Sequence, residues 1–399
     1  MFYKSRTLFI FRMVNRRLLR VKAFQQMYAF WTQERAQHQL AFDGLQTIFL
    51  PDLSLMVAKE EQAPRLEGLR KLAEIQLNEF FQGIPTEESI PAEALEAAQS
   101  VYRVYQNNVA KIAQDMRKNM VVEVESIYKQ YLKLLFYLQN LPNIGQWDEQ
   151  RRLLESPIKT SQIAHNRVLA ILPKWKDLQN AFAENNISWS EDEESLLKKL
   201  FIEGILPDES FVAYLPIAGK DVVQDLEIVK YILKNYLLKH PIMTEFFEEK
   251  DLNWHVNKDV VKSLSTKTFK VESLEELSLQ ALALQWDEDK QFFEELFDYC
   301  VKEDKQLTEW VNDQTKNWDS ERLATSDLII LKMAVAEMIK FASIPVKVSI
   351  NEYIEVAKNY STPKSGPFIN GILDVVSMKL TSEKIIQKSG RGLIDIASK

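Results

Sequence analysis

The sequence of 399 residues is poor in the residues that build disulfides, metal sites and tight turns. Its one cysteine, Cys300, cannot form an internal disulfide and offers a metal a single thiol. Only 10 glycines are present, and none lies between positions 220 and 365, which favours helices over hairpins. No apolar run is long enough to cross a bilayer. We therefore expect a helical protein of the reducing cytoplasm, with Cys300 as a buried structural residue.

Signals of catalysis and of cofactor binding are also missing. The sequence has no glycine-rich phosphate loop and no Gly-x-Ser-x-Gly elbow. The four histidines are scattered, without the spacing of a metal pair. Acidic pairs such as Glu193–Glu194 stand among lysines in helical patterns and are typical of solvated faces. We expect neither an enzyme nor a metal or cofactor site.

Charge is unevenly distributed along the chain. The net charge is -7, yet residues 1–33 contain no aspartate or glutamate. A basic arm on an acidic body allows a local nucleic-acid site despite an acidic net charge. Residues 1–12 could belong to the native start or precede it, with Met13 as the natural start, and the sequence leaves both open. The arm carries Lys4, Arg6, Arg12, Arg16, Arg17, Arg20 and Lys22.

Apolar residues at helical spacing recur along most of the chain. The pattern predicts helices over 15–35, 65–81, 91–118, 221–238 and 272–315. Turn signals at 83–85 and at 141–143 separate some of them. Further along, Thr325 or Ser326 can cap a helix. Ser349 and Glu352 have the spacing of a capping box, and Pro367 suits the first position of a last core helix.

Two motifs carry groups that bind phosphates or bases. Arg16, Arg17 and Arg20, with Lys22, cluster at a helix start, where free N–H groups and the helix dipole also favour anions. The alternative is a solvated basic face, although the lack of nearby acids weakens it. Lys364 and Ser365 begin a turn into a helix that can receive a phosphate, and Phe368 could stack on an unpaired base. The alternative for Phe368 is a core position.

Four segments resemble the NusB antitermination family. Residues 13–28 resemble its first helix, and 322–337 its central helix. Residues 344–358 and 368–374 resemble its C-terminal signature, including Ile-Asn-Glu, Ala-Lys and Phe-Ile-Asn-Gly. The resemblance implies an all-α, NusB-like helical bundle with a large helical insertion. We expect a basic arm and first helix over 1–40, an insertion of unknown role over 41–219, a NusB-like domain over 220–385 and a flexible tail over 386–399.

The resemblance also implies a function. Family members bind the boxA element of nascent ribosomal RNA with the ribosomal protein NusE, in the RNA polymerase antitermination complex. By this resemblance, Arg16, Arg17, Arg20 and Phe368, with the loop before it, match RNA-contacting positions. The positions that match the NusE-facing surface are Tyr28, Glu321 and Asp327.

Two other functions stay open. The chain could be a helical protein-interaction scaffold with a NusB-like fold. It could also be the RNA-recognition subunit of a system that processes or modifies ribosomal RNA. The sequence does not choose between a monomer and a dimer.

Overall fold

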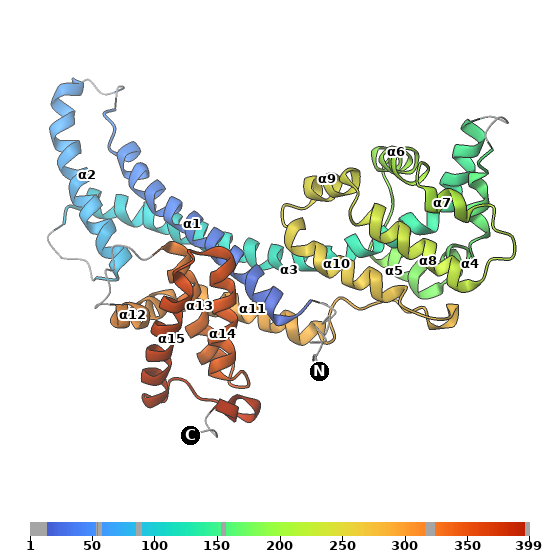
Figure 1. Ribbon diagram of the computed structural model, residues 1–399. Helices are drawn as coiled ribbons and strands as arrows, with labels where there is room; N and C mark the ends of the chain where they lie inside the picture. Colours follow the sequence, from blue (N-terminus) through green and yellow to red (C-terminus); the bar gives the residue numbers. More distant parts are fainter. Residues whose placement is uncertain are drawn as a thin grey trace. The chain divides into compact units, whose positions relative to one another are not determined.

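The computed structural model describes residues 14–52, 54, 58–84, 90–152, 157–315 and 324–395. These residues form helices and loops without a β-strand (Figure 1). The all-α prediction is therefore confirmed. Within this part of the chain, no helix is both long and apolar enough to cross a membrane.

The chain divides into two compact units. Unit 1 comprises Val122–Asp289 and the segment that ends at Asn15. Unit 2 comprises Arg16–Val121 and the chain from Lys290 onward. The first helix and the C-terminal helices thus share a unit, while residues 220–289, which we expected in the NusB-like domain, belong to unit 1. The assignment of an insertion to 41–219 stays a prediction.

Unit 2 contains the helices nearest to the two ends of the chain. It includes the first part of α3 and most of α11. Its elements are α1 (Arg16–Ile48), α2 (Lys59–Gln82), α3 (Ala92–Arg151), α11 (Trp286–Lys302), α12 (Asp304–Thr315), α13 (Thr325–Lys340), α14 (Val346–Tyr360), α15 (Ser365–Ser382) and the short 3-10 helix η7 (Gly390–Asp395).

Helix α13 is the centre of unit 2. Its apolar side chains from Ile329 to Met338 are almost completely buried, because α1, α12, α14 and α15 all pack against it. A helix that is apolar on every side is stable only when other elements enclose it. This explains why α13 lies between the first helix and the C-terminal pair α14 and α15.

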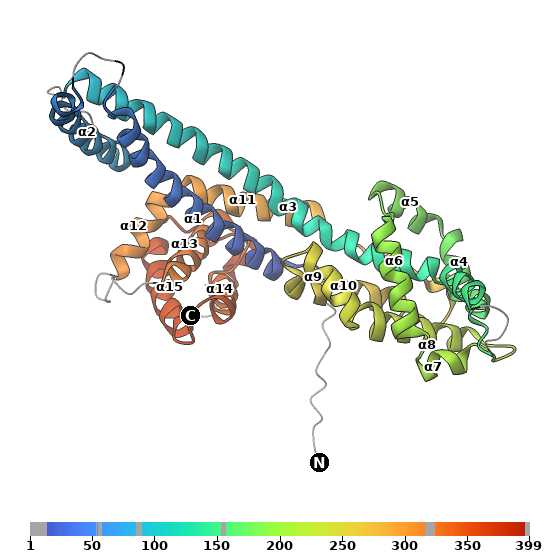
Figure 2. The same cartoon turned by 90° about the horizontal axis from the view of Figure 1, so that it is seen from above.

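A second apolar cluster in unit 2 joins α1, α2 and the start of α3. Leu45 of α1, Leu77 of α2 and Ala98 of α3 are fully buried in it. Both views show α2 beside α1 (Figures 1 and 2). Helix α2 ends at Gly83, whose φ of 73° is the left-handed conformation that glycine adopts without strain. The predicted turn at this position is confirmed for Gly83 and Ile84.

Unit 1 consists of the rest of α3 and short helices around it. Buried Asp225 is one of its polar ties, since it accepts hydrogen bonds from the Tyr214 hydroxyl at 2.6 Å and the Arg167 Nε at 2.9 Å. Its further elements are η1 (Thr160–His165), α4 (Arg167–Ile171), η2 (Leu172–Lys174), α5 (Lys176–Glu184), α6 (Glu191–Leu200), η3 (Phe201–Ile205), α7 (Glu209–Tyr214), α8 (Val222–Ile232), η4 (Leu233–Leu237), α9 (Pro241–Lys250), α10 (Trp254–Thr268) and η5 (Leu274–Glu276).

Several local predictions are wrong. Neither Thr325 nor Ser326 caps a helix, because α13 begins at Thr325 after Ala324, and Pro367 is the third residue of α15 rather than its first. The predicted helix over 272–315 is interrupted, since α11 begins only at Trp286 and ends before α12 begins at Asp304.

Pro142 does not end a helix but lies inside α3, where the buried side chains of Leu138 and Leu141 keep the helix packed. The packing offsets the hydrogen bond that proline cannot make. Ser349 does not cap a helix either. Helix α14 already begins at Val346, after Pro345, and Ser349 is buried inside it.

The expected flexible tail is anchored over its described part. The Ile386 side chain is buried. The Ser389 N–H donates to the Ala342 carbonyl at 3.0 Å, and the Lys388 Nζ donates to the Phe341 carbonyl at 3.0 Å. Residues 386–393 therefore cover the turn between α13 and α14.

Candidate nucleic-acid interface

Arg17 lies on the surface at the start of α1 and is held by α14. Its Nε and one terminal nitrogen donate to the two carboxylate oxygens of Glu352, at 2.8 and 2.7 Å. The side chain is 58% exposed, so the guanidinium remains accessible from solvent. The hydrogen bonds from Arg17 hold the pKa of Glu352 below its ordinary value, although partial burial opposes the shift. The pair positions a cation at the surface without removing it from water.

Arg20, one turn further along α1, is buried. It is 4% exposed and donates two hydrogen bonds to the carboxylate of Glu337, at 2.7 and 2.8 Å. The same carboxylate accepts a hydrogen bond from the Ser349 hydroxyl at 2.7 Å. All three groups lie among α1, α13 and α14, so Arg20 fastens the helices together. This geometry does not fit the expected direct contact with RNA.

The other two basic residues of the α1 motif have different surroundings. The guanidinium carbon of half-buried Arg16 lies 4.9 Å from the centre of the Phe292 ring. This distance is typical of a cation–π contact. Lys22 is only 1% exposed, so its ammonium does not reach the surface. Among the predicted cluster, Arg16 and Arg17 are the two whose charge remains near solvent.

The loop before α15 is tied to α13 through Asp327. Buried Asp327 accepts a hydrogen bond from the Ser365 hydroxyl at 2.8 Å and another from the Ser361 hydroxyl. These bonds fix the turn in which Lys364 is exposed, at the N-cap of α15. Phe368 is half-buried in the first turns of that helix. Asp327 therefore acts as an internal anchor, which does not fit the expected exposed partner contact.

A hollow of about 470 Å³ opens between α14 and the start of α15. Its lining includes apolar Ile354 and Gly366 as well as the polar side chains of Lys358 and Asn370. A hollow with apolar and polar walls can take a base and its phosphate together. Its lining residues are Ile354, Lys358, Ser361, Thr362, Pro363, Gly366, Pro367 and Asn370.

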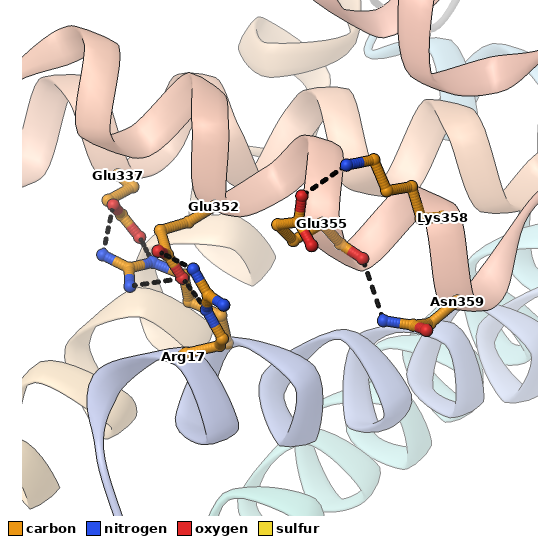
Figure 3. Close-up of polar contacts among 7 residues, drawn as sticks. Arg17, Glu337, Glu352, Glu355, Lys358 and Asn359 are labelled. Atoms are coloured by element: carbon orange, nitrogen blue, oxygen red, sulfur yellow. Dashed lines mark hydrogen bonds and ion pairs between the residues drawn. The ribbon is translucent and has the colours of Figure 1, made fainter. Parts of the chain in front are cut away.

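Helix α14 brings the two predicted motifs together. Arg17 binds Glu352 on this helix, and Lys358, almost two turns further along it, lines the hollow beside the Lys364 loop. Figure 3 shows Arg17 at Glu352, with Glu355 between that pair and Lys358. The first basic motif and the Ser-Gly-Pro turn are thus joined by one helix, although they lie about 340 positions apart in the sequence.

A second hollow, of about 520 Å³, contains the predicted partner residue Tyr28. Tyr28 is 45% exposed, and Phe24 and Tyr360 lie beside it with ring centres 5.2 Å apart. Glu321, the other acid that we expected at this surface, lies outside the described residues. The hollow is lined by Phe24, Gln25, Tyr28, Ala324, Thr325, Ser326 and Tyr360.

Comparisons with known proteins match the C-terminal part of the chain. The NusB family model matches residues 253–378. The chain is 41% identical over 111 residues to the transcription antitermination protein NusB of Salinibacter ruber, covering 27% of this chain and 69% of that protein. The chain belongs to the NusB family. It is 38% identical over 110 residues to the NusB of Chloroherpeton thalassium, covering 28% of this chain but only 52% of that protein. No solved structure matches this chain significantly.

Sequence reasoning missed the acids that position the arginines. Glu337 and Glu352 stand in the family-like segments, but their sequence neighbourhood does not show that they face α1. The signal that could have found Glu337 is a charged residue within the apolar run of α13. A charge at such a position requires a buried partner of opposite sign.

Proposed function

We propose that this NusB-family protein binds boxA-like single-stranded RNA of ribosomal RNA operons together with NusE, within the RNA polymerase antitermination complex. The observation that carries the proposal is the joining of two basic motifs by α14. Arg17 of α1 binds Glu352 at one position of this helix, and the hollow beside Lys364 opens at another. A single strand that follows α14 meets a guanidinium, a lysine and a helix N-terminus in turn.

The proposed RNA contacts involve fewer residues than the motifs predicted from the sequence. Arg16, Arg17 and Lys364 would neutralise phosphates, and Phe368 would stack on a base at the start of α15. Ser365 is buried and would act by fixing the turn. Arg20 and Lys22 are buried, so we propose that they support the surface from below. Phosphate would compete with Glu352 for Arg17, because both are bidentate partners of a guanidinium.

NusE is proposed to dock around Tyr28, where the second hollow exposes aromatic rings. Exposed tyrosine is enriched in protein interfaces because its ring and hydroxyl serve both apolar and polar contacts. Asp327 lies buried at the edge of this region and would act indirectly.

The test is a titration of fluorescently labelled boxA RNA and a scrambled RNA, with and without NusE, near physiological salt. We expect preference for boxA, strengthened by NusE. A triple variant with alanine at Arg16, Arg17 and Lys364 should lose this preference. A matched triple variant with alanine at Lys239, Lys258 and Lys262 in unit 1 removes the same charge and should keep it.

The salt dependence gives a second readout of the same titration. Loss of three phosphate contacts should make the slope of log affinity against log salt shallower by about 2, since each contact to a single strand contributes about 0.7. Equal binding by the two triple variants would contradict the proposal and favour a protein-interaction scaffold.

A further inference from the structure

Helix α2 exposes two large apolar side chains, separate from the face that it buries. Leu69, Ala73 and Leu77 pack into the cluster with α1 and α3. Leu72 and Ile75 are instead 40% and 55% exposed. Together with positions 65, 68 and 79, they form a stripe whose members recur at alternating intervals of three and four residues. This spacing is the heptad pattern of a helix that pairs with another helix.

Gly68 lies in the middle of this stripe, and no contact within the described residues requires a glycine there. A glycine within a helix costs about 1 kcal/mol relative to alanine. A Cβ added at Gly68 would meet nothing within 4 Å, so the fold of the chain does not require the small residue. Glycine at a helix surface does allow a second helix to approach closely. The position therefore indicates a partner helix on the exposed side of α2.

The charges at the two ends of the stripe identify that partner. Arg65 stands seven residues before Leu72, and Glu79 stands seven residues after it. Two copies of α2 that run antiparallel about Leu72 would place each Arg65 opposite a Glu79. Gly68 would then face the large Ile75, and Leu72 would face its own copy. In a parallel pair, by contrast, arginine would face arginine and glutamate would face glutamate.

The contacts that Arg65 and Glu79 make within the chain do not prevent these side chains from binding a second copy. Arg65 donates to Glu93 at 2.8 Å, but both side chains are mostly exposed, and an exposed pair stabilises a fold weakly. The Oε2 of Glu79 is buried and has no hydrogen-bond partner within the described residues. The Glu79 side chain as a whole is only half-buried, so an arginine from another chain would approach the carboxylate from its solvent-facing side.

We propose that a second copy of this chain docks antiparallel on the α2 stripe, defined as Arg65, Gly68, Leu72, Ile75 and Glu79. Such an interface has two-fold symmetry and closes on itself, which limits assembly to a dimer. One helix pair buries less surface than the about 800 Å² per partner of a stable complex. We therefore expect a dissociation constant on the order of micromolar.

The experiment is sedimentation equilibrium of the full chain across the micromolar range. Arg65→Glu should weaken dimerisation at least tenfold, and the double variant Arg65→Glu/Glu79→Arg should restore it. Gly68→Gln should also weaken it at least tenfold while raising the melting temperature, because glutamine is a better helix former than glycine. The rise excludes unfolding as the cause. Glu67→Lys, a charge reversal at an exposed position of the same helix on the side away from the proposed partner, is the matched control.

Cysteine cross-linking tests the register. Oxidised Leu72→Cys should form a disulfide-linked dimer, since this residue faces its own copy. Ile75→Cys should not, because it faces Gly68. A wild-type chain that stays monomeric across the concentration range would overturn the proposal. So would a dimer that is unaffected by the charge swap and by Gly68→Gln, or one that cross-links at Ile75→Cys instead of Leu72→Cys.

Discussion

The guanidinium of Arg20 binds the carboxylate of Glu337 through two hydrogen bonds, although the residues are 317 positions apart in the chain. Both side chains are buried, with 5% and 0% of their surface exposed. The pair joins the first helix to the central helix α13, although most of the chain lies between the two helices in the sequence. In this family member, the start of α1 therefore combines a structural arginine with a surface arginine three residues earlier.

Replacing Arg20 should cost stability. Arg20→Ala leaves the Glu337 carboxylate buried without its cation, which typically costs about 3–5 kcal/mol. The free energy of unfolding in urea measures this loss. The double variant Arg20→Leu/Glu337→Leu removes both charges and should unfold less readily than Arg20→Ala. A loss below about 1 kcal/mol for the single variant would show that the pair does not hold the helices together.

Replacing Arg17 should weaken RNA binding but hardly change stability. Its pair with Glu352 is exposed on the arginine side, so Arg17→Ala should change the free energy of unfolding by about 1 kcal/mol or less. If Arg17 contacts a phosphate, the affinity for boxA RNA should fall about tenfold, which equals about 1.4 kcal/mol. Anisotropy and urea unfolding of the same sample separate the two effects. Unchanged affinity would remove Arg17 from the proposed surface.

Acid should weaken the Arg17–Glu352 pair. Hydrogen bonds from Arg17 lower the pKa of Glu352 below its ordinary value of 4.5. A carboxyl whose pKa is lower in the folded state contributes stability that is complete above the ordinary value and is lost as pH falls through the folded value. The difference in unfolding free energy between wild type and Glu352→Gln should thus be largest near neutral pH and shrink below about 4.5. A difference that grows with acid would contradict this sign.

Asp327 should act on RNA binding through the loop. Asp327→Ala removes the carboxylate that accepts from the Ser361 and Ser365 hydroxyls and leaves them only neighbouring hydroxyls as partners, at a cost of about 1–3 kcal/mol. We expect faster hydrogen exchange of the amides of residues 361–366 and weaker RNA binding. Ser326→Ala is a control for the neighbouring hydroxyl, which contacts Ser361 but not Asp327. Unchanged exchange in this loop would show that another contact fixes it.

The sequence was sufficient for the fold class and for the two ends of the chain. The apolar periodicity of α13 and the Phe-Ile-Asn-Gly segment of α15 indicated both, because local spacing reports which face of a helix is buried. Such spacing carries no information about which distant helix covers that face. The pairing of Arg20 with Glu337 could therefore not be predicted from the sequence.

The local errors have a similar cause. Pro142 is a helix breaker by its own chemistry, yet the burial of Leu138 and Leu141 just before it keeps α3 continuous. Ser349 has the spacing of a capping box with Glu352, but the two residues bind Glu337 and Arg17 instead. In both cases, contacts with distant residues outweigh a preference that the local sequence expresses correctly.

Ultraviolet cross-linking of the full chain to boxA RNA, followed by mass spectrometry, tests the central claim most directly. The claim is that the start of α1 and the start of α15 form one RNA-binding surface. It predicts cross-linked peptides that contain Arg16 and Arg17, and others that contain Lys364 and Phe368, both competed by unlabelled boxA RNA. Cross-links confined to residues 122–289 of unit 1 would contradict it.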